Sequence, residues 1–132
     1  MSSVSAGLGE YLRYRGREGM WAWILHRVTG LGVMFFLFWH ILDIFLMALG
    51  QDEFDRFLVI YKATPFRILE AFLIFGVLFH AFNGARVILL DFVPSVMDYE
   101  SELFWLVLGA TLVIWAPAAL AMLAPLVGIN IL

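Results

Sequence analysis

The apolar and polar positions divide the chain into three long hydrophobic stretches with short polar segments between them. The stretches cover about residues 21–50, 66–92 and 103–130. A helix that crosses about 30 Å of hydrocarbon needs about 20 residues, and each stretch meets this length. The pattern therefore predicts an all-α membrane protein with three transmembrane helices. We expect residues 1–132 to form one membrane domain, in which residues 1–20 are a cytoplasmic N-terminal segment.

Composition supports this class and excludes others. The 132 residues are 64% hydrophobic and only 14% charged, which is far more apolar than a water-soluble domain of this size. The chain has no cysteine, so disulfides, thiolate zinc sites and cysteine-ligated iron–sulfur clusters are excluded. Any metal must therefore be bound by histidine, methionine or carboxylate. No basic patch with interleaved aromatic residues indicates a nucleic-acid partner.

Positive charges near the first hydrophobic stretch predict the orientation of the chain. Arg13, Arg15 and Arg17 precede that stretch, and an excess of arginine is typical of the cytoplasmic side. We therefore expect a cytoplasmic N-terminus and, after three crossings, a C-terminus on the opposite side. The second connection is acidic, with three carboxylates between residues 98 and 102, where the same rule prefers basic residues.

The connection between the first two stretches has a pattern of its own. Phe54, Phe57, Leu58 and Tyr61 fall at helical spacing with charged residues between them. This pattern is typical of a short amphipathic helix on the membrane surface. An ordinary connecting turn is the alternative interpretation.

The second stretch contains the sequence FHAFNGARVILLDF, residues 79–92, in which ionisable groups lie among apolar ones. Such groups cost about 2.5–3.5 kcal/mol at the centre of a span, so they normally face protein, water or a cofactor. Gly76, His80 and Gly84 repeat every four residues and share one helix face. This face predicts a flat slot beside an imidazole, which suits a haem. The alternative is a helix-packing face with a histidine that hydrogen-bonds a neighbouring helix.

Depth along the helices suggests how charge is arranged around that histidine. At about 1.5 Å per residue, Arg27 and Arg86 each lie roughly 9 Å from the cytoplasmic ends of their spans, so they are predicted to share one layer. His80 then lies roughly 9 Å deeper than Arg86, a plausible distance between a haem iron and its carboxylates. We expect the two arginines to bind an anion from outside the chain, although Asp91 is an alternative partner for one of them.

The other two histidines are too far apart to share one metal. His26 and His40 are 14 residues apart, or roughly 21 Å along a helix. By the same count His40 lies about 10 Å further toward the far surface than His80, so these two cannot be opposite ligands of one haem. The opposite ligand to His80 must therefore come from another chain. His40 is either a ligand of a second haem or a structural histidine bonded to Asp43.

Two motifs resemble a known family. LHRVTG, residues 25–30, resembles an H-R-x-[ST]-G signature at the start of a first helix. HAFNGARVILLDF, residues 80–92, is similar to an H-x-x-x-G-x-R-H-x-x-x-D-x signature at the end of a second. Both signatures belong to the cytochrome b membrane-anchor subunit of succinate dehydrogenase, which is succinate:quinone oxidoreductase or respiratory complex II. The three-helix layout extends the resemblance over essentially the whole chain.

The resemblance implies a place in a larger enzyme. A second membrane-anchor subunit would complete the helical bundle and share haem b with this chain in the cell inner (cytoplasmic) membrane. An iron–sulfur subunit and a flavoprotein subunit would dock on the cytoplasmic face and pass electrons from succinate to a quinone. The chain would be a subunit of the oxidoreductase without catalysing a reaction alone.

The resemblance also implies roles for single residues. His80 corresponds to the axial ligand of the haem iron, with the opposite ligand supplied by the companion subunit. Arg27, His26 and Arg86 would lie at the haem propionates. His40 resembles a first-helix histidine of members with two haems, which keeps a second haem open.

The quinone site departs from the family pattern. Arg27 and Asp91 correspond to family residues near the quinone, but Trp23 stands where a serine hydroxyl often contacts it. A tryptophan would stack on the quinone or donate its indole N–H. Val87 replaces a frequent histidine after Arg86, which removes one propionate donor.

Two other function classes fit the same residues. One is a haem-free anchor whose polar residues lock the helices together and bind quinone. The other is a small proton-relay or transport subunit, in which His80, Arg86 and Asp91 would form the relay.

Overall fold

The computed structural model describes residues 18–129, and these residues form an all-helical chain without a strand. Three helices are long: α2 (Glu18–Leu49), α4 (Thr64–Phe92) and α5 (Glu100–Leu123). Three are short: α3 (Gln51–Tyr61) and the 3₁₀ helices η1 (Pro94–Tyr99) and η2 (Ala124–Val127). The predicted all-α class is confirmed. The arginines on which the predicted orientation depends, Arg13, Arg15 and Arg17, lie outside the described residues.

Three helical segments between residues 18 and 129 are long and apolar enough to cross a membrane, judged by length and composition. They are Glu18–Leu49, Thr64–Phe92 and Pro94–Val127, where the last combines η1, α5 and η2. All three begin before the predicted stretches, which start at residues 21, 66 and 103. Three apolar spans were predicted, and three are present.

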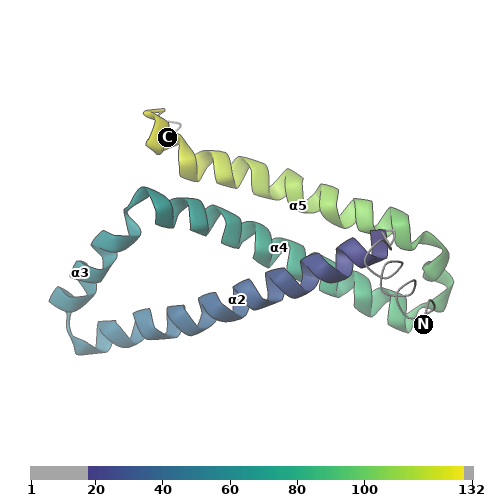
Figure 1. Cartoon of the computed structure of the whole chain (residues 1–132), viewed down its shortest axis with the longest axis horizontal. Coiled ribbons are helices and arrows are strands. Elements are labelled where there is room, and N and C mark those ends of the chain that lie inside the picture. Colours follow the sequence, from purple (N-terminus) through teal and green to yellow (C-terminus); the bar gives the residue numbers. More distant parts are fainter. Residues whose placement is uncertain (1–17, 130–132) are drawn as a thin grey trace, which may run out of the picture.

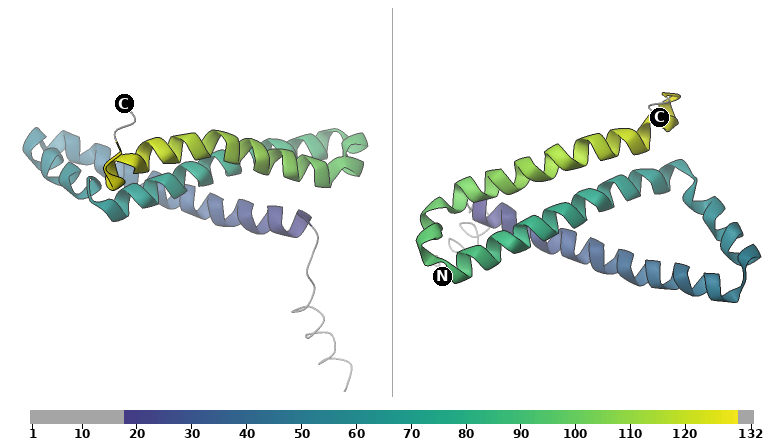
Figure 2. Two further views of the ribbon diagram at one scale, coloured as in Figure 1. Left: turned by 90° about the horizontal axis from the view of Figure 1, so that it is seen from above. Right: turned by 180° about the vertical axis from the view of Figure 1, so that it is seen from behind.

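Helix α4 lies at the centre of the molecule, and both other long helices run antiparallel to it (Figure 1). Helix α5 lies along α4, whereas α2 crosses α4 near the end where η1 lies and diverges from it toward α3 (Figures 1 and 2). Ala22, Phe79, Phe104 and Val107 form the buried apolar core at this crossing, with at least one residue from each long helix. The η1 end of the bundle is therefore tightly packed, and the α3 end is open.

The connections follow from local sequence. Gly50 has a φ of 139°, a backbone conformation that favours glycine, and it turns the chain from α2 into α3. Pro65 lies in the first turn of α4, where the missing N–H costs no hydrogen bond. In α3 the apolar residues Phe54 and Phe57 are half-buried, while the charged residues are exposed. The predicted helix is confirmed and the connecting-turn interpretation is wrong.

Most apolar side chains of this chain face outward. Among the 32 residues of α2, only Ala22 is buried. An outward apolar surface of this kind suits lipid or another membrane helix, because water would oppose it. Polar bonds also join the other two long helices, and in one of them the Trp115 indole N–H donates to the Ala71 carbonyl at 2.7 Å.

Candidate functional site

The two histidines nearest the α2–α4 crossing lie against each other. The rings of His26 and His80 are parallel to within 6°, with their centroids 4.0 Å apart. The predicted depths were wrong on this point, since His80 lies level with His26 instead of deeper in the membrane. The physical reason is the register of the two helices, which is set by packing and cannot be counted from span ends.

A backbone hydrogen bond orients the His80 ring. Its Nδ1 atom lies 3.1 Å from the carbonyl oxygen of His26. A carbonyl oxygen can only accept, so in the neutral ring Nδ1 carries the proton and Nε2 has the free lone pair. A histidine that ligates a metal through one ring nitrogen usually donates the N–H of its other nitrogen to a carbonyl or carboxylate in this way.

Three glycines let the helices approach at this point. A Cβ at Gly30 would lie 2.9 Å from Cε1 of His80, and one at Gly84 would lie 3.6 Å from Cε1 of His26. A Cβ at Gly76 would contact Thr29 at 3.9 Å. The flat slot predicted on the Gly76–Gly84 face is therefore absent, because α2 occupies that face. The glycines act as the alternative interpretation proposed, as a helix-packing device.

Arg86 lies on another side of α4. It is 7% exposed, and its Nη2 donates to the carbonyl oxygen of Glu100 at 2.8 Å. Its Nε has no partner among residues 18–129. The bond joins the end of α4 to the beginning of α5. Arg86 and Arg27 share no hydrogen-bond partner among residues 18–129, and their predicted shared layer stays a prediction.

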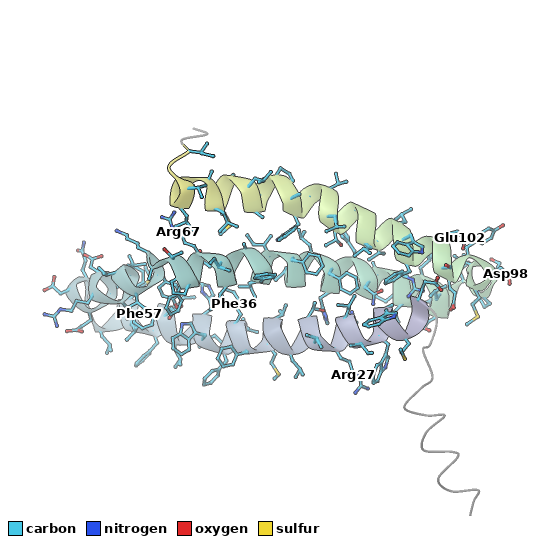
Figure 3. All side chains as sticks on the ribbon, turned by 45° about the horizontal axis from the view of Figure 1, so that its top comes forward. Arg27, Phe36, Phe57, Arg67, Asp98 and Glu102 are labelled. Carbon is cyan, nitrogen blue, oxygen red and sulfur yellow. The ribbon has the colours of Figure 1, made fainter. Side chains whose placement is uncertain are left out.

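Arg27 and Trp23 form a pair on the outer surface of α2. The Arg27 guanidinium lies 4.3 Å from the centre of the Trp23 ring, within the range of a cation–π contact. Both side chains are exposed, and Figure 3 shows Arg27 pointing away from the other helices. The other residue predicted to face quinone, Asp91, is exposed near the end of α4. No hydrogen bond or ion pair joins Asp91 to the pair within the described part of the chain.

A separate polar cluster lies at the α3 end. The Tyr61 hydroxyl donates to the Asp43 carboxylate and accepts from the Trp39 indole N–H. Burial and then the bond to Asp43 raise the pKa of Tyr61 to about 12. The predicted His40–Asp43 bond is not formed, since Asp43 bonds Tyr61. The His40 ring is exposed and stacks on Phe36, with 5.4 Å between centroids.

Sequence reasoning gave no role to several residues around the histidine pair. Thr29 donates its hydroxyl to the Leu25 carbonyl at 2.7 Å and lies 3.5 Å from His80 Nδ1. Asn83 is 1% exposed, and its Oδ1 has no partner in the described residues. Thr29 falls inside the first quoted motif, and Asn83 lies three residues after His80, so their positions were visible signals. Their contacts depend on helix register.

No group of three or more metal-ligating side chains of His, Asp or Glu occurs in residues 18–129. A haem that is shared by two chains needs only one ligand from each, so this finding does not exclude a shared haem. The histidines of this chain suit a haem of that kind. His80 has an oriented ring with a free Nε2, and the buried Nδ1 of His26 beside it has no partner in the same residues.

Comparison with known proteins identifies what this arrangement resembles. The family model for the succinate dehydrogenase/fumarate reductase transmembrane subunit matches residues 10–116, which include both histidines and both arginines of the site.

Two curated proteins are similar over much of their length. The succinate dehydrogenase 2 membrane subunit SdhC of Mycobacterium tuberculosis is 38% identical over 105 residues, which are 80% of this chain and 77% of that protein. The succinate dehydrogenase hydrophobic membrane anchor subunit of Halobacterium salinarum is 32% identical over 74 residues, or 55% of this chain and 57% of that protein.

Proposed function

The chain belongs to the succinate dehydrogenase/fumarate reductase transmembrane subunit family, as a membrane-anchor subunit of an oxidoreductase complex, and from this premise we propose that it binds haem b through His80 and helps to form a quinone site. The quinone would receive the electrons of succinate through the iron–sulfur subunit. The chain contributes binding residues and performs no catalysis alone.

The observation that carries the haem proposal is the Nδ1 bond of His80. The His26 carbonyl holds the ring in one orientation, and in the neutral imidazole it leaves the free lone pair on Nε2. His80 as a residue is half-buried. The opposite ligand would come from the second membrane-anchor subunit. When bound there, haem b would supply one-electron transfer at a potential set by its axial ligands and surroundings.

Two arginines near His80 in the sequence motifs suit the carboxylates of a haem. Arg27 follows His26 in the chain, and its guanidinium is exposed on the surface of α2. Arg86 carries a buried positive charge whose Nε has no partner in residues 18–129. We propose that Arg27, His26 and Arg86 contribute to the propionate region, with Arg86 restricted by its bond to Glu100.

The Arg27–Trp23 pair is the proposed quinone-facing element. A guanidinium held over an indole has fixed donors that would stabilise negative charge on a quinone oxygen as it is reduced. The indole offers a flat face for the quinone ring. Asp91 is proposed as a further residue of the same interface.

The exposed apolar surface of α2 supports a membrane partner. We propose that the second membrane-anchor subunit covers it, and that the iron–sulfur and flavoprotein subunits dock at the η1 end. That end would face the cytoplasm, in the cell inner membrane, with the N-terminus on the same side. His40 faces outward in this arrangement, so a second haem would lie between subunits.

Replacing the proposed ligand tests the haem. We expect His80→Ala in the purified complex to abolish one low-spin b-type signal in the reduced-minus-oxidised spectrum. His40→Ala is the matched control, and it should leave that signal in place while removing a second one if two haems are bound. An unchanged spectrum in His80→Ala would exclude His80 as the ligand.

A second experiment tests the quinone role. Arg27→Ala should lower succinate-dependent quinone reduction by at least tenfold and leave succinate oxidation with an artificial acceptor near the wild-type rate. Arg56→Ala, at an exposed arginine of α3 on the opposite side of the molecule, should leave both rates unchanged. Equal loss of both activities in Arg27→Ala would contradict the assignment.

A haem-free quinone-binding anchor is the second candidate. The packing of Gly76 and Gly84 against α2 favours it, because these glycines are explained without a cofactor. Purified wild-type complex without b-type haem would establish this alternative.

A further inference from the structure

A cavity of about 600 Å³ lies between α2 and α4, on the α3 side of their crossing. Leu25, Thr29 and Gly76 line its narrow end, where the two helices meet. Trp39, Tyr61 and Glu70 line its wide end beside α3. Figure 1 shows the two helices diverging toward α3 along this length. The cavity therefore tapers from the α3 surface toward the middle of the proposed membrane.

The lining is apolar except at one end. Six aromatic side chains supply much of it: Phe35, Phe36, Trp39, Phe66, Phe72 and Phe75. The Thr29 hydroxyl at the narrow end is already donated to the backbone of its own helix. The remaining polar side chains, Tyr61 and Glu70, lie at the wide end. An occupant with a long apolar part and a polar end would match this distribution.

We propose that this cavity binds one acyl chain of an amine-headed phospholipid from the membrane leaflet that contains α3. The acyl chain would point toward Gly76, and the headgroup would lie near Glu70 and Tyr61. This site is separate from the proposed haem and quinone residues, none of which lines the cavity. The proposal therefore stands or fails independently of the proposed function.

The volume suits a small occupant. Small-molecule sites in proteins commonly have volumes of about 300–1,000 Å³, and this cavity, at about 600 Å³, lies in that range.

Charge at the wide end favours an amine. Glu70 lines the cavity and forms no hydrogen bond or ion pair within residues 18–129. Asp43 lies beside Tyr61, and its Oδ1 is buried without a partner in the same residues. A carboxylate next to apolar surface is stabilised by a cation. An ammonium headgroup supplies this cation, whereas an anionic headgroup would add repulsion.

Two glycines allow a matched test of the acyl-chain site. Gly32 lines the cavity, and a Cβ there meets no atom within 4 Å, so Gly32→Phe introduces a bulky side chain at the cavity without a clash at its Cβ. Gly109 in α5 is equally open and does not line the cavity, so Gly109→Phe is the control. The whole complex would be reconstituted with phosphatidylethanolamine that carries a photoreactive diazirine in its acyl chain.

We expect wild-type and Gly109→Phe complexes to cross-link the probe to Phe36 and Phe75, which line the cavity and are half-buried. Gly32→Phe should lower this labelling at least fivefold, while labelling of outward residues stays unchanged. Equal cavity labelling in Gly32→Phe, or labelling of outward residues alone, would overturn the proposal. Loss of cavity labelling on addition of a quinone with an isoprenoid tail would also overturn it, because the cavity would then hold that tail.

The headgroup is tested by a second probe. Phosphatidylglycerol with the same diazirine chain should label the cavity residues at least threefold less than phosphatidylethanolamine. Glu70→Gln should remove this difference, because it removes the charge and keeps the shape. Equal labelling by both lipids in the wild type would overturn the amine assignment.

Discussion

Gly30 offers a sharp test of the packing at the histidine pair. It is the last residue of the LHRVTG motif, and it faces His80 across the α2–α4 crossing. In Gly30→Ala the added Cβ would lie 2.9 Å from Cε1 and 3.3 Å from Nδ1 of the imidazole. Carbon atoms do not approach this closely, so the ring must move. Its Nδ1 bond to the His26 carbonyl and its stack on His26 oppose the movement.

The magnitude follows from three contributions. Alanine is a better helix former than glycine by at most about 1 kcal/mol. Overpacking a filled contact costs about 1–3 kcal/mol, and the loss of the Nδ1 bond costs about 1 kcal/mol more. The sum is a net destabilisation of roughly 1–3 kcal/mol. If His80 binds haem, loss of its orienting bond should weaken that binding by about 10–100-fold.

The measurement is thermal unfolding of the purified complex together with its haem content. Gly32→Ala is the control, because a Cβ there meets nothing within 4 Å and should leave both properties unchanged or improved. Gly30→Ala with the stability and haem content of Gly32→Ala would refute the packing argument. Reduced stability with unchanged haem affinity would support the packing and refute the role of His80.

Three further predictions concern other contacts. The pKa of Tyr61 is raised to about 12, first by burial and then by its bond to Asp43. The stability that the neutral phenol contributes is therefore present below a pH of about 10, and it is lost as the pH rises through about 12. Tyr61→Phe should remove the latest step in the ultraviolet tyrosinate titration, and an unchanged titration would contradict this. Arg86→Met should lower the free energy of unfolding by about 1–3 kcal/mol, measured by thermal denaturation, because the bond to the Glu100 carbonyl is lost. Trp115→Phe should lower it by at least about 1 kcal/mol, since it removes the indole donor between α5 and α4 and shortens the ring that packs against Phe75. No change would contradict a stabilising role for this bond.

Local pattern was enough to predict the secondary structure. Length and apolarity predicted the three long helices, because a backbone in hydrocarbon must satisfy its hydrogen bonds within each segment. The spacing of Phe54, Phe57 and Tyr61 predicted α3 in the same way. The motifs around His26 and His80 also predicted the family, which comparison with known proteins then showed.

The predicted depth of His80 was wrong because the ends of two packed helices need not lie level with each other. Counting from span termini placed His80 below the Arg27 layer, whereas the structure stacks it on His26. Side-chain volume at the crossing decides this register, and the small residues Gly30, Gly76 and Gly84 allow it. A span terminus gives no information about such contacts.

The sequence by itself determined that this chain is an all-α membrane protein with three long apolar helices, since these properties depend on residues close together in the chain. The tertiary structure alone decided that the glycine face of α4 is filled by α2, that Arg86 bonds the start of α5, and that α2 and α4 diverge to leave a cavity beside α3. These features depend on how distant helices fit together, and the volumes of side chains far apart in the chain set that fit.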